Sequence, residues 1–165
     1  MKKFFFCLTV FCLHLSASAT DVAGTIKQHS EHSAMPDRPY GKNDNSFGAY
    51  MEFFEGPAGW RIGAAFSDDL SGPFEADRVI TPEITLLFQD GAWEAGVSVL
   101  KDYLKIEDNT GWKSTYFQFQ LGLNMPFGKK GSVGIHTFYP FESWGKLSEF
   151  KFDDLDFGIT VRYRF

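Results

Sequence analysis

The side chains with acid–base chemistry gather at two places in the chain. Asp68 and Asp69 follow directly after Ser67, and His29 and His32 lie three residues apart near the start. A histidine beside a carboxylate can act as a general base, and a serine within its reach can act as a nucleophile. These five residues are therefore the candidate catalytic set. The plainer alternative is that the two aspartates are solvated carboxylates of a surface loop.

Metal and cofactor chemistry are not expected. The pair His29 and His32 supplies two ligands, whereas zinc sites use three or four, and the chain carries no cofactor-binding motif. We expect no metal site and no cofactor.

Residues 1–19 read as a secretory signal peptide. Lys2 and Lys3 precede an apolar run, and Ala17-Ser18-Ala19 has the small-residue pattern of a cleavage site. The predicted domains are thus the signal peptide, 1–19, and a mature domain, 20–165. Both cysteines fall in the predicted signal peptide, and its loss takes the formal charge from −5 to −7. An exported acidic chain is not expected to bind nucleic acid.

The last nine residues alternate strictly between apolar and small or charged side chains, which is the period of a β-strand. One face carries Phe157, Ile159, Val161, Tyr163 and the terminal Phe165. This stretch resembles the C-terminal targeting strand of bacterial outer-membrane β-barrel proteins. The resemblance implies a Gram-negative outer membrane as the location and the barrel-assembly machinery as a partner, with targeting carried by these five residues.

Similar alternation recurs upstream. Together with the last nine residues it indicates seven clear strands, near residues 47–54, 60–67, 80–89, 93–100, 115–125, 133–139 and 157–165. Short turns, such as Asp90-Gly91, alternate with long connections over 68–79, 101–113 and 140–155. Single-chain bacterial barrels have an even strand count, short periplasmic turns and long external loops. An eighth strand is therefore expected near 21–29. The predicted fold is all-β: a monomeric, eight-stranded, antiparallel, up-and-down transmembrane β-barrel.

The residues between the apolar ones are predicted to face the lumen, and they divide into two groups. The periplasmic half would hold an ionic plug, made of Glu52, Arg61, Glu94, Arg162 and Arg164. The outer half would hold a ligand pocket open to the outside, lined by Tyr50, Ala65, Ser98, Leu100, Tyr116, His136 and Phe138. The alternative is that these side chains simply fill the space.

A second resemblance concerns the loop end. Arg38-Pro39-Tyr40-Gly41, then Phe47-Gly48, then Ala65-Phe66-Ser67-Asp68-Asp69, is similar to segments of the outer-membrane lipid A palmitoyltransferases. The resemblance implies that Asp68 is a catalytic aspartate and that His29 or His32 is the catalytic histidine. Asp69 stands where that family has its serine.

Three functions follow from these patterns. The leading hypothesis is a structural or surface-interaction barrel, with outer-membrane lipid and lipopolysaccharide as partners, the latter through divalent cations held by acidic loops. The second is a lipid A acyl-modifying enzyme. The third is a soluble periplasmic, lipocalin-like barrel that turns its apolar residues inward around a ligand.

Overall fold

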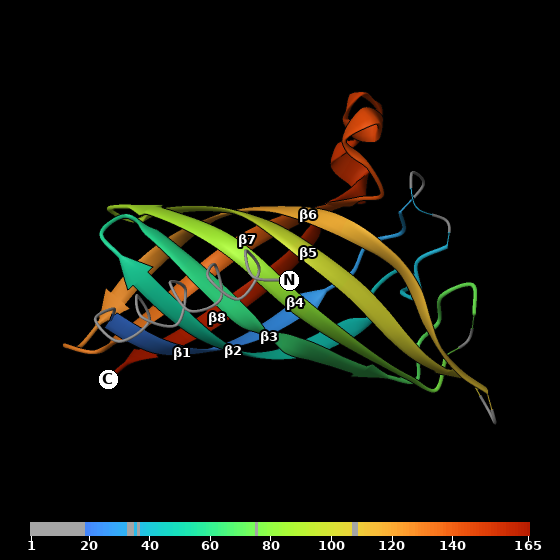
Figure 1. Cartoon of the computed structure of the whole chain (residues 1–165), viewed down its shortest axis with the longest axis horizontal. Coiled ribbons are helices and arrows are strands. Elements are labelled where there is room, and N and C mark those ends of the chain that lie inside the picture. The colour runs from blue at the N-terminus through green and yellow to red at the C-terminus, as the bar shows by residue number, and fades with distance from the viewer. Residues whose placement is uncertain (1–18, 33–34, 36, 75, 107–108) are drawn as a thin grey trace, which may run out of the picture.

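The chain forms one closed β-barrel of eight antiparallel strands in sequence order (Figure 1). The computed structural model describes residues 19–32, 35, 37–74, 76–106 and 109–165. The predicted signal peptide therefore lies outside the described residues, except for Ala19, which begins the first strand. Among the described residues, no helix has the length and hydropathy needed to span a bilayer.

Each strand pairs with its neighbours in the chain, and the last pairs with the first. The strands are β1 Ala19–Gln28, β2 Asn45–Glu55, β3 Ala58–Asp68, β4 Arg78–Asp90, β5 Trp93–Ile106, β6 Asn109–Phe127, β7 Gly131–Phe141 and β8 Asp156–Arg164. Two 3-10 helices, η1 Trp144–Glu149 and η2 Phe152–Asp154, lie between β7 and β8. Closure comes from the β1–β8 ladder, in which Asp21 lies opposite Arg164.

The two ends of the barrel differ in their connections. One end carries the short turns, each of which contains a glycine with positive φ: Gly56, Gly91 and Gly128. A left-handed backbone at these positions is what a tight hairpin between twisted strands requires. The other end, called the mouth below, carries the longer segments 29–44, 69–77 and 142–155.

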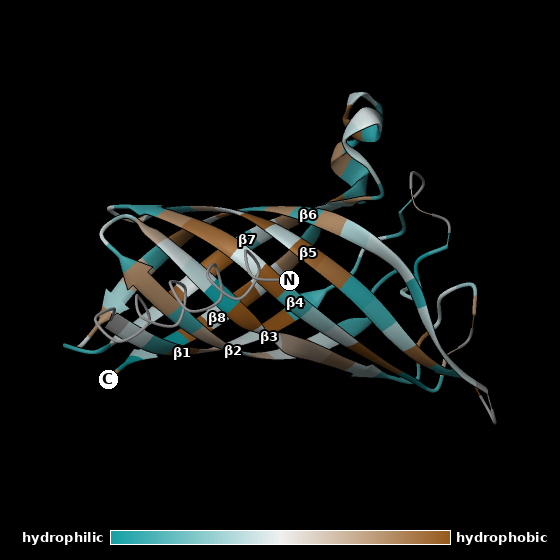
Figure 2. Cartoon of the chain, in the orientation of Figure 1, coloured by the Kyte–Doolittle hydropathy of each residue, from teal (hydrophilic) through white to brown (hydrophobic). Residues whose placement is uncertain are grey.

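The strands turn their apolar side chains outward. Ile26, Phe47, Ile135 and Ile159 are each 53–55% exposed on the outer wall, and hydrophobic positions recur along the strands while the loops at the mouth are mainly hydrophilic (Figure 2). The intervening residues are buried in the lumen and many are charged. The lipocalin-like alternative, which needed these apolar residues inside, therefore differs from the structure.

The first strand matches the expectation of an eighth strand near 21–29, although it begins at Ala19 and ends one residue before His29. The prediction of a long connection over 101–113 is wrong. There, β5 and β6 continue as a paired hairpin beyond residue 100, with a register shift between Lys101 and Tyr103. Lysines and polar residues at the outward positions of this extension hid its alternation.

Candidate functional site: a pocket at the mouth of the barrel

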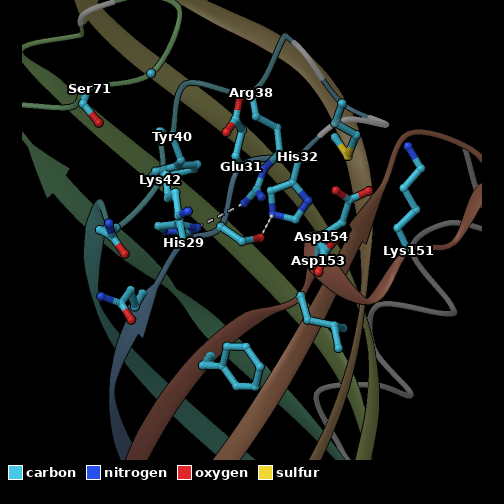
Figure 3. Close-up of a pocket in the computed structure, with 18 of the residues that line it drawn as sticks. His29, Glu31, His32, Arg38, Tyr40, Lys42, Ser71, Lys151, Asp153 and Asp154 are labelled. Carbon is cyan, nitrogen blue, oxygen red and sulfur yellow. Dashed lines mark hydrogen bonds between the residues drawn. The ribbon is translucent and has the colours of Figure 1, made fainter.

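The mouth contains an open pocket of about 1330 Å³ (Figure 3). Its walls come from three loop segments and the ends of two strands. The lining residues are Gln28 to His32, Met35, Arg38, Tyr40 to Asn43, Ser71 to Pro73, Lys151 to Leu155 and Phe157. The pocket therefore joins chain segments that are far apart in sequence, and each is held in place by the strand that precedes or follows it.

Asp156 lies beneath the floor of this pocket and organises it, because its carboxylate holds three residues that line it, His29, His32 and Arg38. Its carboxylate accepts hydrogen bonds from His29 Nδ1 at 3.0 Å and from His32 Nε2 at 2.8 Å. Arg38 approaches the same carboxylate with Nη1 and Nη2 at 3.3 Å, and the Ser30 backbone N–H donates at 2.9 Å. Asp156 is fully buried, and these donors replace the water that the carboxylate loses. One carboxylate thus ties His29, Ser30, His32 and Arg38 to β8.

His29 has a defined arrangement of its two ring nitrogens. An ionised carboxylate can only accept, so Nδ1 carries the proton toward Asp156 and Nε2 accepts from Ser46 Oγ at 3.0 Å. Tyr40 stacks on the imidazole, with ring centroids 3.8 Å apart. Ser46, His29 and Asp156 therefore form a serine–histidine–aspartate relay.

Burial keeps both histidines neutral. Loss of hydration lowers the pKa of His29 to about 4, because it outweighs the opposing attraction of Asp156. The pKa of His32 is lowered for the same reason. The floor at neutral pH thus holds one carboxylate, one guanidinium and two neutral imidazoles, and its net charge is zero.

Below the floor, the lumen is filled by hydrogen-bonded side chains. Tyr40 donates to Thr81 Oγ1 at 2.7 Å, Thr81 donates to Asp102 at 2.6 Å, and Tyr116 donates to the same carboxylate oxygen at 3.1 Å. This chain ties the loop residue Tyr40 to three strands of the barrel.

Deeper still lies an ionic cluster. Arg61 and Arg162 both contact Glu52 and Glu94, with nitrogen–oxygen distances from 2.7 to 3.5 Å. Gln120 and Asn124 donate further hydrogen bonds to Glu94. The two positive and two negative side chains are buried and balance each other in charge. We call these four ionic residues the plug.

The structure brings four of the five residues predicted for the plug together and places the fifth elsewhere. Arg164 pairs instead with Asp21 at 3.0 Å, at the turn end of the barrel, where its side chain is 53% exposed.

The residues predicted to line an outer-lumen pocket are buried inside the barrel, and none of them lines the mouth pocket. They are Tyr50, Ala65, Ser98, Leu100, Tyr116, His136 and Phe138. Large side chains among them, Tyr50, Tyr116 and Phe138, occupy that part of the lumen, so the cavity forms above them, between the loops.

The five catalytic candidates separate into two groups. His29 and His32 meet on Asp156. Asp68 and Asp69 are exposed on the β3–β4 side, where Asp68 lies opposite Arg78 and the Asp69 backbone bonds to Asp77. Ser67 is buried, and its hydroxyl has no hydrogen-bond partner among the described residues. No hydrogen bond or ion pair found in the described part of the chain joins these three to the histidines.

Sequence reasoning missed Asp156 and Ser46. One signal for Asp156 was available: Gly158, Thr160 and Arg162 face the lumen, and Asp156 continues that every-second-residue face by one step. Ser46 faces the lumen on β2 for the same reason, opposite Lys27. Within the described ranges, no group of three or more histidine, cysteine or acidic side chains is arranged to hold a metal ion.

Comparison with known proteins gives the fold. No family model and no curated protein sequence matches the chain. Among solved structures, Neisserial surface protein A is similar with a TM-score of 0.50 and 11% identity, covering 90% of this chain and 96% of its own. Ail, the attachment invasion locus protein of Yersinia pestis, has a TM-score of 0.43 and 15% identity, covering 90% and 97%. The first match agrees with an eight-stranded barrel over nearly the whole chain.

Proposed function

We propose that this protein is a small barrel of the bacterial outer membrane, with a surface-interaction role exercised through the mouth pocket. The observation that carries the proposal is the pairing of an apolar outer wall with a charged, plugged lumen. A water-soluble barrel with this pattern would expose its apolar wall to water, and it would have no apolar core to offset the cost of the buried ions.

Strand length supports the same proposal. About 9–11 tilted residues cross the hydrocarbon core of a bilayer, and the shortest strands, β8 and β1, have 9 and 10. In this proposal the short turns face the periplasm and the mouth faces outward, which places the His29–Asp156 pocket at the cell surface. The partners are then outer-membrane lipid, lipopolysaccharide and molecules that bind the cell surface from outside.

The test of location is electrophoretic. A barrel of this kind, extracted from outer membranes in detergent, should migrate faster unheated than boiled, and an epitope inserted at residues 72–73 should be detected on intact cells. Deletion of Phe165 should reduce the outer-membrane fraction, while an exposed control, Lys129→Gln in the turn after β6, should not. Full recovery of the unmodified protein in the soluble periplasm would sink the proposal.

A second candidate function is acyl modification of a surface lipid such as lipid A. The observation that favours it is the Ser46–His29–Asp156 relay. His29 Nε2 is positioned to take the Ser46 proton as the oxygen attacks the acyl carbonyl of a donor ester, and to give that proton to the alcohol that departs when the ester C–O bond breaks. Ser46 is only 2% exposed, which makes this function the second candidate rather than the first.

Mass spectrometry of lipid A, from cells with and without the gene, tests this candidate. A change in acyl chains that is lost in Ser46→Ala and kept in Asp68→Ala would assign it to the relay. Loss in Asp68→Ala and retention in Ser46→Ala would assign it instead to Asp68, as the palmitoyltransferase resemblance implies. Identical lipid A in all strains removes the candidate.

A further inference from the structure

The segment between β7 and β8 leaves the barrel sideways. Residues 142–155, called the shelf below, project away from the wall instead of continuing along the barrel axis (Figure 1). The 3-10 helix η1 contains no buried residue. A loop that only closed the mouth would fold over the opening, whereas this segment lies at the side of the barrel with its 3-10 helix exposed.

Aromatic side chains join the shelf to the outer wall. Trp144 lies with its ring centroid 5.3–5.7 Å from those of Phe117, Phe119 and Phe141 of β6 and β7. Phe150 packs 4.7 Å from Tyr139. Despite these contacts, Trp144 remains 54% exposed and Phe152 is 78% exposed.

The composition of the shelf suits the boundary between lipid and water. Tryptophan and phenylalanine carry the apolar area, and Lys146 forms a hydrogen bond with Glu142 at 2.7 Å nearby. Aromatic rings with adjacent polar groups concentrate at the headgroup level of bilayers. Phe117 and Phe119 belong to the outward, apolar face of β6, so the shelf continues the wall that the proposed function places in lipid.

The shelf also forms one wall of the mouth pocket. Lys151 to Leu155 line it, and so does Phe157, which is 54% exposed on the outer face of β8. A pocket confined within the barrel mouth would not include an outward residue. The lining therefore passes over the rim from the polar floor around Asp156 to the apolar outer wall.

The charged side chains that line the pocket are balanced, with three of each sign: Arg38, Lys42 and Lys151 against Glu31, Asp153 and Asp154. Arg38 also pairs with Asp156 beneath the lining. This mixture suits the polar end of an amphiphile, whose apolar end would lie along Phe152 and Phe157.

Taken together, the geometry points to a membrane lipid as the ligand. We propose that the shelf rests on the outer leaflet and that the mouth pocket opens over Phe157 toward that leaflet, so that it receives the headgroup of a bilayer lipid. This inference rests on the proposed function, because it requires the barrel to be inserted.

The experiment uses tryptophan fluorescence in phosphatidylcholine vesicles whose acyl chains are brominated just below the headgroups. The chain has four tryptophans. Replacing Trp60, Trp93 and Trp112 by Phe leaves Trp144 as the shelf reporter. A chain with all four replaced and Phe152→Trp added reports on the pocket edge. A third chain that keeps only Trp93, on the outer wall, reports insertion. Heat-modifiable migration of each variant verifies its fold.

The expected result is blue-shifted emission and loss of intensity for all three reporters. Quenching of Trp93 with water-like, unquenched emission from both shelf reporters overturns the inference and leaves the proposed function intact. Quenching of Trp144 without quenching of the Phe152→Trp reporter keeps the shelf on the leaflet and overturns the membrane-facing pocket. An unquenched Trp93 in a folded variant instead removes the proposed membrane barrel itself.

Discussion

Glu94 is the residue with most partners in the plug. It contacts both arginines and accepts hydrogen bonds from Gln89, Gln120 and Asn124. Glu94→Gln should lower the free energy of unfolding by about 3 kcal/mol, because two buried guanidinium groups would then share one carboxylate. Urea unfolding in detergent, followed by the mobility shift, measures this loss.

The matched control for Glu94 is Glu55→Gln, which makes the same chemical change on an exposed side chain at a turn. It should leave the unfolding midpoint nearly unchanged. Equal effects of the two substitutions would mean that the loss reflects net charge and not the plug.

His29 should make stability depend on pH in a defined window. Its pKa is about 4 in the folded protein and near the ordinary 6.5 when unfolded, so the unfolded chain binds a proton first as pH falls. The stability present above pH 6.5 should therefore decline between pH 6.5 and about 4. Burial is the main cause, and Arg38 and Lys27 add to it, while Asp156 opposes it.

The measurement is the free energy of unfolding against pH for the wild type and for His29→Asn. The variant should show a smaller slope across the window, and the remaining slope includes His32, whose pKa is also lowered. Equal slopes would show that His29 is protonated in the folded protein as readily as in the unfolded chain.

Among single residues, the sequence predicted which charged side chains face the lumen, but it did not predict the contacts of the mouth pocket. The strict alternation places Glu52, Arg61, Glu94 and Arg162 on the lumen face. Because buried charges lose their hydration, they are expected to pair with one another. Asp156 was missed because it is the first residue of β8, directly after a loop, where the strand alternation cannot be told from loop composition. Its partners His29 and Arg38 come from an irregular segment, whose course depends on contacts across the mouth.

At the level of elements, the short turns test the hairpin interpretation. Gly91 has φ +60 and open space around its α-carbon, so Gly91→Ala should cost only backbone strain, about 1–2 kcal/mol. Gly91→Asn should cost less, since asparagine tolerates this conformation. The unfolding midpoints of the two variants provide the comparison.

Gly111 is the control for this pair, because it also has open space but no positive φ. Gly111→Ala in β6 should be neutral or slightly stabilising. A loss as large as that of Gly91→Ala would indicate that glycine is needed for a reason other than the turn.

Strands with apolar outward faces were readable, whereas the extension of β5 and β6 was not. Its outward positions include Lys101 and Lys105, whose charges do not fit a lipid-facing pattern. They indicate that this part of the hairpin extends beyond the apolar band of the outer wall. The shelf was predicted only as a long connection, because its 3-10 turns are set by packing of Trp144 on neighbouring strands.

For the whole molecule, the plug predicts that the barrel does not conduct ions. Eight strands leave an interior narrow enough for side chains to fill, and Arg61, Arg162, Glu52 and Glu94 occupy it. Planar-bilayer recordings of the purified protein should show a flat baseline under applied voltage. Discrete, reproducible current steps from folded protein would contradict a sealed lumen.

Closure of the sheet has a consequence for the order of events in time. Asp21 and Arg164 pair across 143 positions of chain, so the first strand lacks one of its two neighbours until the final residues have been synthesised. A partly synthesised chain therefore cannot form a closed sheet. The unpaired edge strands of such a sheet would be prone to aggregation. The ring can therefore close only in a late step, when the C-terminal strand becomes available to pair with the first.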